Sequence, residues 1–331
     1  MGRDRDLSDI RIFSGSAHPA LAHAICDYLG VPLQPTITSR FSNDNLYVHL
    51  GASVREQEVF LIQPLSPPVS DHLLELLMML DIARSASARS IHAVIPYYSY
   101  GRSDKKDAPR ISITGRLIAD LLHTAGATHV ITMTLHSPQV HGFFGVPTDD
   151  LTARSVLARH FQGRDLSGTT LVSPDIGHAK RAAEFAQMLG NLPMAAGNKT
   201  RYGDNVVRVE IIGEVRGHHA ILMDDEIATG SSMIETVNQL REKGITEVSV
   251  VCTHGVFTAG ALHKLAAVPE ITEIVTTDTL PIPEEGRPPM LHVLSVAPLF
   301  GEAIRSNFMG LSLGDLFIDW TDSVKPVRTD H

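Results

Sequence analysis

The chain has 331 residues, of which 43% are hydrophobic and 20% charged, a composition typical of globular proteins and long enough for two domains. Its formal net charge of -9 argues against a surface that binds the phosphate backbone of a nucleic acid. Cys26 and Cys252 have no metal-type spacing, so we expect two buried thiols. The amino terminus lacks the apolar core of a secretory signal, and the apolar residues 73–83 are too few to span a bilayer. We therefore expect a cytoplasmic protein.

Apolar runs that predict strands alternate along the chain with amphipathic stretches that predict helices. The predicted strands cover residues 59–65, 91–98, 129–135, 169–175, 220–225, 247–254 and 273–280. The predicted helices cover residues 71–85, 115–126, 177–189 and 233–244. This alternation predicts an α/β protein with mostly parallel sheets flanked by helices, in which ligands bind beyond the carboxyl ends of the strands.

Two pairs of segments indicate an internal repeat. Residues 125–137 align with 243–255, each a helix end, a turn and an apolar strand. Residues 92–104 align with 219–231, each an apolar strand that runs into a polar loop before a helix. Unrelated βα units also resemble each other, so chance similarity is the alternative. The repeat predicts two domains, residues 8–150 and 151–318.

The segment 221–240, ILMDDEIATGSSMIETVNQL, carries the clearest chemistry. Asp224 and Asp225 end an apolar strand, and residues 229–232 then lead into a helix. Free backbone N–H groups, hydroxyl groups and the positive end of a helix dipole form a seat for phosphate, while carboxylates accept hydrogen bonds from sugar hydroxyls. The segment therefore predicts a sugar-phosphate site, although a capped helix with serines in a tight turn fits the same letters.

The stretch ILMDDEIATGSS resembles the ribose-phosphate signature of the phosphoribosyltransferase fold. Together with IPYYSYGRSDKK, LHSPQVHGFFGVP, LVSPD, GNKTR and SVAPLFGEAI, in that order along the chain, it resembles the ribose-phosphate diphosphokinase family, also called phosphoribosyl pyrophosphate synthetases. The resemblance covers residues 10–318. It implies two tandem phosphoribosyltransferase-like domains, with ATP bound on the amino-terminal side and ribose 5-phosphate on the carboxyl-terminal side.

The resemblance also implies the reaction and its residues. Diphosphate would pass from ATP to the C1 hydroxyl of ribose 5-phosphate, giving phosphoribosyl pyrophosphate and AMP. Lys199 and Arg201 match the catalytic loop, where cations stabilise the transferring group. Mg²⁺ is the expected cofactor, with His136 and Asp175 at the metal site. Outside the family context, Lys199 and Arg201 fit a solvated basic turn, and His136 fits a structural histidine.

The substrate-binding residues follow from the same resemblance. Those expected to bind ATP are Phe41, Asn43, Asn45, Arg102, Ser103, Lys105 and His136. Those expected to bind ribose 5-phosphate are Asp224, Asp225, Ala228, Thr229, Gly230, Ser231 and Ser232. Taken alone, Phe41 would be assigned to a core.

Three stretches depart from the family pattern, at four positions. Asn43 and Asn45 stand where carboxylates usually face the adenine amino group, and an amide both donates and accepts, so base selectivity could be altered. Ser103 replaces a longer polar side chain, so that its contact with ATP needs a water molecule. Ala228 replaces the carboxylate that directly precedes Thr229, and Glu226 is the nearest substitute.

Two further hypotheses stay open beside an active synthetase. The changes at Asn43, Asn45 and Ala228 would permit a catalytically weak paralogue that regulates an active synthetase. Because the phosphate seat is shared by the whole fold, the other is a phosphoribosyltransferase that consumes phosphoribosyl pyrophosphate. The expected partners are the substrates ATP and ribose 5-phosphate, with no nucleic acid and no membrane. By resemblance we expect a homo-oligomer, either a dimer or a hexamer.

Overall fold

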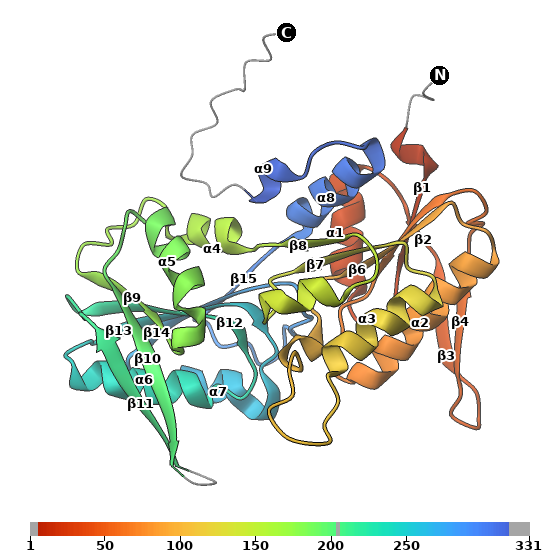
Figure 1. Ribbon diagram of the computed structural model, residues 1–331. Coiled ribbons are helices and arrows are strands. Elements are labelled where there is room, and N and C mark those ends of the chain that lie inside the picture. The colour runs from red at the N-terminus through yellow and green to blue at the C-terminus, as the bar shows by residue number, and fades with distance from the viewer. Residues whose placement is uncertain (1–5, 203–205, 318–331) are drawn as a thin grey trace. The chain divides into compact units, whose positions relative to one another are not determined.

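The computed structural model describes residues 6–202 and 206–317, and the chain divides into two compact units. The first unit contains residues 6–152, 279–281 and 295–317, and the described part of the second contains residues 153–278 and 282–294. Each unit is built on a mostly parallel sheet with helices on both faces (Figure 1). The predicted α/β fold class is confirmed.

The sheet of the first unit has the strand order β2-β1-β5-β6-β7-β8, and all its neighbouring strands are parallel. Helices α2 and α3 cover one face, and α1 and α8 cover the other (Figure 1). Strands β3 and β4 form a separate antiparallel hairpin. The elements are η1 Leu7–Asp9, β1 Ile10–Ser14, α1 Pro19–Leu29, β2 Leu33–Gln34, β3 Thr36–Arg40, β4 Leu46–Leu50, β5 Glu58–Ile62, α2 Val69–Ser85, β6 Ser90–Ile95, η2 Ser99–Arg102, α3 Thr114–Ala125, β7 His129–Met133, η3 Pro138–Phe143, β8 Thr148–Leu151, α8 Ala297–Met309 and α9 Gly314–Phe317.

The sheet of the second unit has the order β11-β10-β9-β12-β13-β14-β15, and only the β10–β11 pair is antiparallel. Helices α4 and α5 lie on one face, and α6 and α7 lie on the other (Figure 1). The elements are α4 Arg154–Phe161, β9 Thr169–Ser173, η4 Ile176–His178, α5 Ala179–Met188, β10 Met194–Tyr202, β11 Val206–Gly213, β12 His219–Ile227, α6 Ser231–Glu242, β13 Glu247–Gly255, η5 Thr258–Gly260, α7 Ala261–Ala266, β14 Ile271–Thr277 and β15 Leu291–Leu294.

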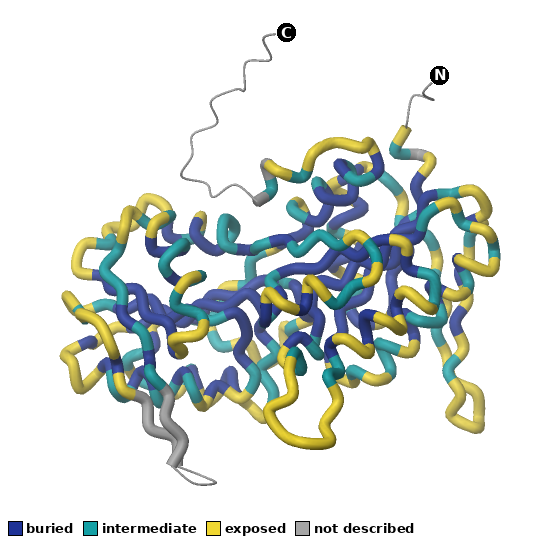
Figure 2. The backbone as a smooth tube through the Cα atoms, in the orientation of Figure 1, coloured by how far each residue is buried: buried dark blue, intermediate teal, exposed yellow. Residues whose placement is uncertain are grey.

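Burial explains why these segments form the elements they do. All five residues of β5 are buried, as expected for a strand covered on both faces, whereas α2 buries Leu76, Met79, Leu80 and Ala83 on one stripe at helical spacing. The strands of both sheets are buried throughout most of their length, while the loop between η2 and α3 is exposed (Figure 2). The polar segments that follow the strands therefore lie at the ends of the strands, outside the buried part of each sheet.

The compact units are not contiguous in sequence, unlike the predicted division into residues 8–150 and 151–318. Helix α8 belongs to the first unit because it packs against α1. Gly301 permits this packing, since a Cβ atom there would lie 2.4 Å from Cδ1 of Tyr28. The break in sequence near residue 152 coincides with the passage from β8 to α4.

The two sheets share an order of connections, but not in the register that the sequence repeat predicts. In both units a first strand (β1 or β9) is followed by a helix and by a strand that pairs on one side of it (β2 or β10). The later parallel strands are then added one after another on its other side, beginning with β5 or β12. This order makes β5 equivalent to β12, and β6 equivalent to β13. The sequence alignment instead paired β6 with β12, one strand out of register, because successive βα units look alike.

Within the described residues, none of the helices combines the length and the apolar character that spanning a membrane requires. Cys26 and Cys252 are both buried free thiols, as the sequence predicted.

Candidate active site

The turn between β12 and α6, residues 224–232, is called the sugar-phosphate turn below. Strand β12 delivers Asp224 and Asp225 at its carboxyl end, and Gly230 then caps α6 with the left-handed backbone angle φ of 76°. Thr229 and Ser231 are exposed, and their hydroxyl oxygens lie 3.3 Å apart. Because the first turn of a helix has free N–H groups, exposed hydroxyls beside it form a suitable seat for an anion.

His178 links this turn to the neighbouring strand β9. Its Nδ1 lies 3.1 Å from Oδ1 of Asp224 and 3.7 Å from Oδ1 of Asp225. The hydrogen bond to Asp224 raises the pKa of His178, which favours the imidazolium form. Burial, with the nearby charge of Asp225, raises the pKa of Asp224 to about 6 despite that hydrogen bond. The carboxylate pair therefore attracts a proton or a hydrogen-bond donor.

Asp175 lies at the same end of the same sheet. Val172 of β9 pairs with Leu222 of β12, so Asp175 and Asp225 each follow three residues beyond that pair. Oδ1 of Asp175 accepts a hydrogen bond of 2.7 Å from the N–H of Gly177, which fixes the carboxylate at the start of η4. A carboxylate held in this way is a suitable ligand for a divalent cation.

Glu226 and Ala228 complete the turn. Glu226 is only 8% exposed and is paired in register with His254 of β13, whereas Asp225, its predecessor, points to the opposite face of the strand. Ala228 is half-buried between the strand and the helix. The turn therefore has no carboxylate directly before Thr229, and Glu226 lies within the sheet.

Lys199 and Arg201 lie on β10, whose backbone pairs with β11 through Lys199 with Val209 and Arg201 with Val207. Their side chains lie outside the described part of the molecule. The antiparallel pair β10–β11 lies beside β9, and β9 is the strand that leads to Asp175.

The first unit gathers a second set of candidates at the carboxyl ends of β6 and β7. Gly101 lies against His136, because a Cβ atom at Gly101 would be 3.5 Å from the backbone nitrogen of His136. Arg102 and Lys105 are exposed on the loop that follows. Ser103 instead closes the base of this loop: its hydroxyl accepts from the N–H of Thr114 at 2.9 Å and donates to a carbonyl oxygen at 3.2 Å.

The remaining ATP candidates occupy the tip of the β3–β4 hairpin, which stands apart from the loop between η2 and α3 (Figure 1). Phe41 is 57% exposed and packs edge-on against Tyr47, so its assignment to a core is wrong. The side-chain oxygen of Asn43 accepts a hydrogen bond from the N–H of Asn45 at 3.3 Å, which shapes the tight turn. The sequence identified these residues as candidates, but it did not show that they lie apart from Arg102.

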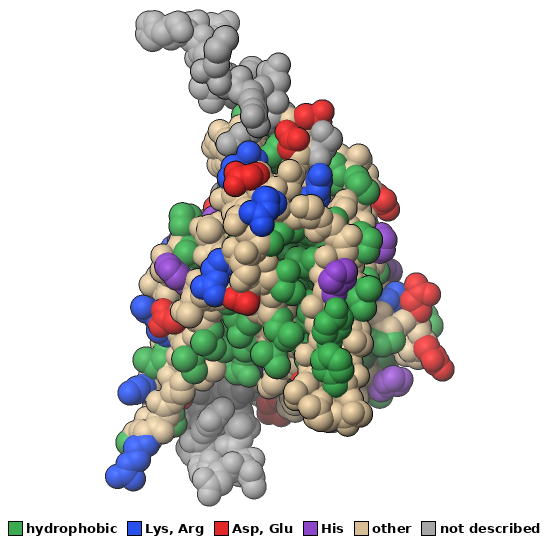
Figure 3. Space-filling view, turned by 90° about the vertical axis from the view of Figure 1, so that its right-hand side faces the viewer, with side chains coloured by type: hydrophobic (Ala, Val, Ile, Leu, Met, Phe, Trp, Pro, Cys, Tyr) green, Lys and Arg blue, Asp and Glu red, His purple; other side chains and the backbone are tan. Residues whose placement is uncertain are grey.

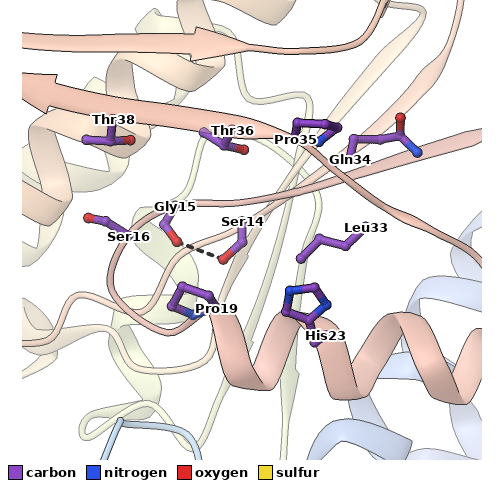
Figure 4. A pocket seen from close by; sticks show the side chains of 10 residues that line it. All are labelled: Ser14, Gly15, Ser16, Pro19, His23, Leu33, Gln34, Pro35, Thr36 and Thr38. Atoms are coloured by element: carbon purple, nitrogen blue, oxygen red, sulfur yellow. Dashed lines mark hydrogen bonds between the residues drawn. The ribbon is translucent and has the colours of Figure 1, made fainter.

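A cavity of about 400 Å³ opens at the carboxyl end of β1, beside the start of α1 (Figure 4). Hydroxyl groups and the imidazole of His23 line it, and the hydroxyl of Ser14 donates to the carbonyl oxygen of Gly15 at 2.7 Å. Neither this cavity nor His178 was predicted from the sequence. For His178, the signal was its position three residues after Asp175 in SPDIGH.

Comparison with known proteins identifies the family of the chain. Residues 10–126 match the model described as the N-terminal domain of ribose phosphate pyrophosphokinase, and residues 201–318 match the phosphoribosyl synthetase-associated domain. A putative ribose-phosphate pyrophosphokinase of Streptomyces coelicolor is 55% identical over 94% of this chain and 98% of its own length. The ribose-phosphate pyrophosphokinase of Deinococcus radiodurans is 48% identical over 94% of this chain and 98% of its own length.

A solved structure agrees with these relatives. The phosphoribosylpyrophosphate synthetase from Mycobacterium smegmatis superposes with a TM-score of 0.85 at 38% identity, covering 91% of this chain and 99% of that one. The predicted family, fold and enzyme class are confirmed: the chain belongs to the ribose-phosphate pyrophosphokinase family and is a diphosphotransferase of that family.

Proposed function

We propose that the chain transfers diphosphate from Mg-ATP to the C1 hydroxyl of ribose 5-phosphate, with the second unit binding the sugar phosphate and the first unit binding the nucleotide. The observation that carries this assignment is the sugar-phosphate turn, where paired carboxylates and the amino terminus of α6 are joined by five residues. A ligand that has both vicinal hydroxyls and a phosphate fits this arrangement, and ribose 5-phosphate has both.

In this proposal the backbone N–H groups at the start of α6, with Thr229, Ser231 and Ser232, hold the 5-phosphate. Asp224 and Asp225 accept hydrogen bonds from the ribose hydroxyls. His178, positively charged beside them, keeps the two carboxylates oriented. Ala228 contributes only backbone, so orientation of the sugar relies on the aspartate pair alone.

The nucleotide is assigned to the exposed groups of the first unit. Arg102 and Lys105 would neutralise the ATP phosphates, and His136 lies next to Arg102's loop through the close contact with Gly101. Phe41 would stack on adenine, with the amides of Asn43 and Asn45 near its edge. Ser103 is engaged at the base of its loop, so we propose that it contacts ATP only through a water molecule.

Mg²⁺ is the proposed metal ion. The fixed carboxylate of Asp175 offers the hard oxygen donor that this ion prefers, and His136 is the second residue assigned by family resemblance. When bound, the ion supplies positive charge that neutralises the phosphate oxygens. The protein's own groups bind and orient both substrates, so that the C1 hydroxyl oxygen attacks the β-phosphorus in line and AMP leaves.

Lys199 and Arg201 are proposed to stabilise the charge of the migrating diphosphate. Lys199→Ala is expected to lower kcat by a hundredfold or more, because a positive charge that acts in the transition state is removed. The matched control is Lys243→Ala, an exposed lysine at the end of α6, which should leave kcat unchanged. Full activity in Lys199→Ala would remove this assignment.

One assay separates the possible activities. The purified protein is incubated with ribose 5-phosphate, Mg²⁺ and ATP, and both AMP and phosphoribosyl pyrophosphate are measured, then the assay is repeated with other nucleotides because of Asn43 and Asn45. Stoichiometric formation of both products supports the proposal. No product until an active synthetase is added supports a regulatory paralogue, and consumption of phosphoribosyl pyrophosphate by a base supports a phosphoribosyltransferase.

We further propose a cytoplasmic homo-oligomer, a dimer or a hexamer. Hydrophobic side chains gather on the face seen in Figure 3, and the first unit exposes Tyr28, Ile37 and Tyr47 by 41% or more of their surface. Exposed apolar side chains are common at protein interfaces. Light scattering after size-exclusion chromatography distinguishes monomer, dimer and hexamer.

A further inference from the structure

A group of polar side chains lies in the second unit at the amino ends of the strands, opposite the edge that holds the sugar-phosphate turn. Its centre is Glu273, the third residue of β14, which is only 12% exposed. His160 reaches it from α4, and His292 from the edge strand β15. These three residues are called the His–Glu–His cluster. Because β12 begins at His219 and its carboxyl end leads into the turn, the strand's full length separates the two places.

The two carboxylate oxygens of Glu273 have different surroundings. Oε1 accepts hydrogen bonds from the hydroxyl of Ser249 at 2.7 Å and from Nη1 of Arg164 at 2.8 Å. Oε2 faces the two imidazoles, with Nε2 of His160 at 3.0 Å and Nε2 of His292 at 3.9 Å. One oxygen is thus anchored by the protein, and the other is directed at two nitrogen donors.

The hydrogen bonds from Ser249 and Arg164 hold the side chain of Glu273 in place. Ser249 is in turn 2.8 Å from Nε2 of His219, so the anchor continues into the sheet.

The contacts of His160 conflict with one another in the absence of a cation. Its Nε2 lies 2.6 Å from Nη2 of Arg164, which can only donate, and 3.0 Å from Oε2 of Glu273, which as a carboxylate can only accept. A single ring nitrogen cannot accept the first hydrogen bond and donate the second. A cation between Nε2 and Oε2 would take both atoms as ligands. Nη2 of Arg164 would then have to move away from Nε2, while Nη1 could keep its hydrogen bond to Oε1.

We propose that His160, Glu273 and His292 bind a divalent transition-metal ion of the Zn²⁺ class. The three ligand atoms all lie within 4.8 Å of one another. Zinc bonds of about 2.0–2.1 Å to nitrogen and oxygen set neighbouring ligand atoms of a tetrahedral site roughly 3.4 Å apart, between the two distances measured from Oε2. Two imidazoles and one carboxylate select such an ion over Mg²⁺, which prefers oxygen ligands.

The half-exposed edge of the cluster gives the ion its entry path and a place for a water ligand. The side chain of His292 is 45% exposed, and that of Arg164 is 41% exposed. Ser249 and Arg164 hold the glutamate from behind, as partners of metal ligands commonly do. The positive charge of Arg164 lowers affinity, so we expect binding in the micromolar range and not the tight binding of a structural zinc.

The test uses Co²⁺ as the probe, titrated into the full-length protein with Mg²⁺ in millimolar excess to occupy sites that prefer oxygen ligands. Tetrahedral Co²⁺ absorbs visible light strongly, and Zn²⁺ added afterwards should abolish that absorption. The signal assigned to the cluster is the difference between the unaltered protein and His292→Ala. We expect His292→Ala to weaken Co²⁺ binding at least tenfold.

His263→Ala, which removes an exposed histidine on α7, is the matched control and should leave the titration unchanged. Glu273→Gln provides a second variant that nearly preserves side-chain volume, and it should also lose the tetrahedral spectrum. A Co²⁺ titration that is identical in the unaltered protein and in folded His292→Ala and Glu273→Gln proteins would falsify the proposal. The readout is independent of catalysis, so its failure leaves the proposed function untouched.

Discussion

Topologically equivalent strands of the two units end beside carboxylates that have different partners. In the first unit β5 leads to Gln63 and to the buried Glu75 of α2, whereas in the second unit β12 leads directly to Asp224 and Asp225. Both places contain carboxylates at the carboxyl end of a parallel strand. They differ in what those carboxylates contact.

Glu75 is satisfied from within its own unit. It accepts hydrogen bonds from the N–H of Ser16 at 3.0 Å, the hydroxyl of Ser16 at 2.6 Å, the hydroxyl of Thr38 at 2.5 Å and Nε2 of Gln63 at 2.6 Å. Four donors leave this carboxylate little capacity to bind a ligand. It joins β1, the hairpin and α2, and its role is therefore structural.

The aspartates of the second unit are the ones we propose to bind a ligand. Asp224 contacts His178 and the N–H of its neighbour, and the pair lies where an exposed turn opens the helix α6. The corresponding helix α2 begins after Pro68 without a side-chain cap, and the hydroxyl of Ser66 before it lies 3.2 Å from Nδ1 of His72. We therefore propose that the same strand end serves cohesion in the first unit and substrate binding in the second, and that the residues of the following turn make the difference.

The largest effect on this comparison is expected from Gly230→Ala. A methyl group at Gly230 costs roughly 1 kcal/mol at this φ of 76°, lies 3.3 Å from Cγ of Leu265, and shifts the N–H groups that face the phosphate. We expect kcat/KM for ribose 5-phosphate to fall tenfold or more, mainly through KM, in steady-state assays.

Gly244→Ala is the matched control, because Gly244 follows the other end of α6, has a φ of 90° and has no atom within 4 Å of an added Cβ. It should show a comparable loss of stability with unchanged KM. Equal kinetic losses in both variants would mean that helix stability, not the phosphate seat, explains the effect.

Contiguous features of the site were predictable from sequence, and features assembled across the chain were not. The sugar-phosphate turn is one uninterrupted segment, so its strand, turn and helix could be identified together. His178 meets Asp224 only because β9 and β12 are neighbours, and Glu75 meets Ser16 across 59 residues. Both contacts depend on strand order, which local patterns do not encode.

The fold shows the same division. Buried strands such as β5 and amphipathic helices such as α2 have periodicities that predict their type. The return of α8 to the first unit depends on the fit of Gly301 against Tyr28, and the one-strand error in the repeat arose because β6 and β12 share a local pattern. Tertiary packing decided both.

Glu75→Gln is expected to have the next largest effect, on stability. The substitution places an amide NH₂ among groups that donate, leaving buried donors unpaired at a cost of about 1–3 kcal/mol. Urea denaturation followed by circular dichroism measures the change.

The control for Glu75 is Asp71→Asn, one turn earlier on α2. Asp71 contacts Arg40 at 2.7 Å with 48% of its side chain exposed, and such ion pairs contribute about 0–1 kcal/mol. A Glu75→Gln protein as stable as Asp71→Asn would remove the structural role assigned to Glu75.

The smallest effect concerns two histidines whose pKa values shift in opposite directions. Burial lowers the pKa of His92, which stacks on Phe60 and lies beside His129 and Glu58, whereas Asp224 raises the pKa of His178. Below pH 6.5 the unfolded chain binds a proton that folded His92 resists, so its contribution to stability is lost as the pH falls below 6.5. The contribution of His178 is complete below pH 6.5 and is lost as the pH rises through its raised pKa.

Replacing each histidine with glutamine should therefore change the pH profile of stability in opposite senses. His92→Gln should flatten the loss of unfolding free energy on the acid side, and His178→Gln should flatten the loss above pH 6.5, each by at most about 1.4 kcal/mol per pH unit. Urea midpoints measured from pH 5 to pH 8 give both slopes. Slopes of the same sign would show that the pKa values of His92 and His178 do not shift in opposite directions.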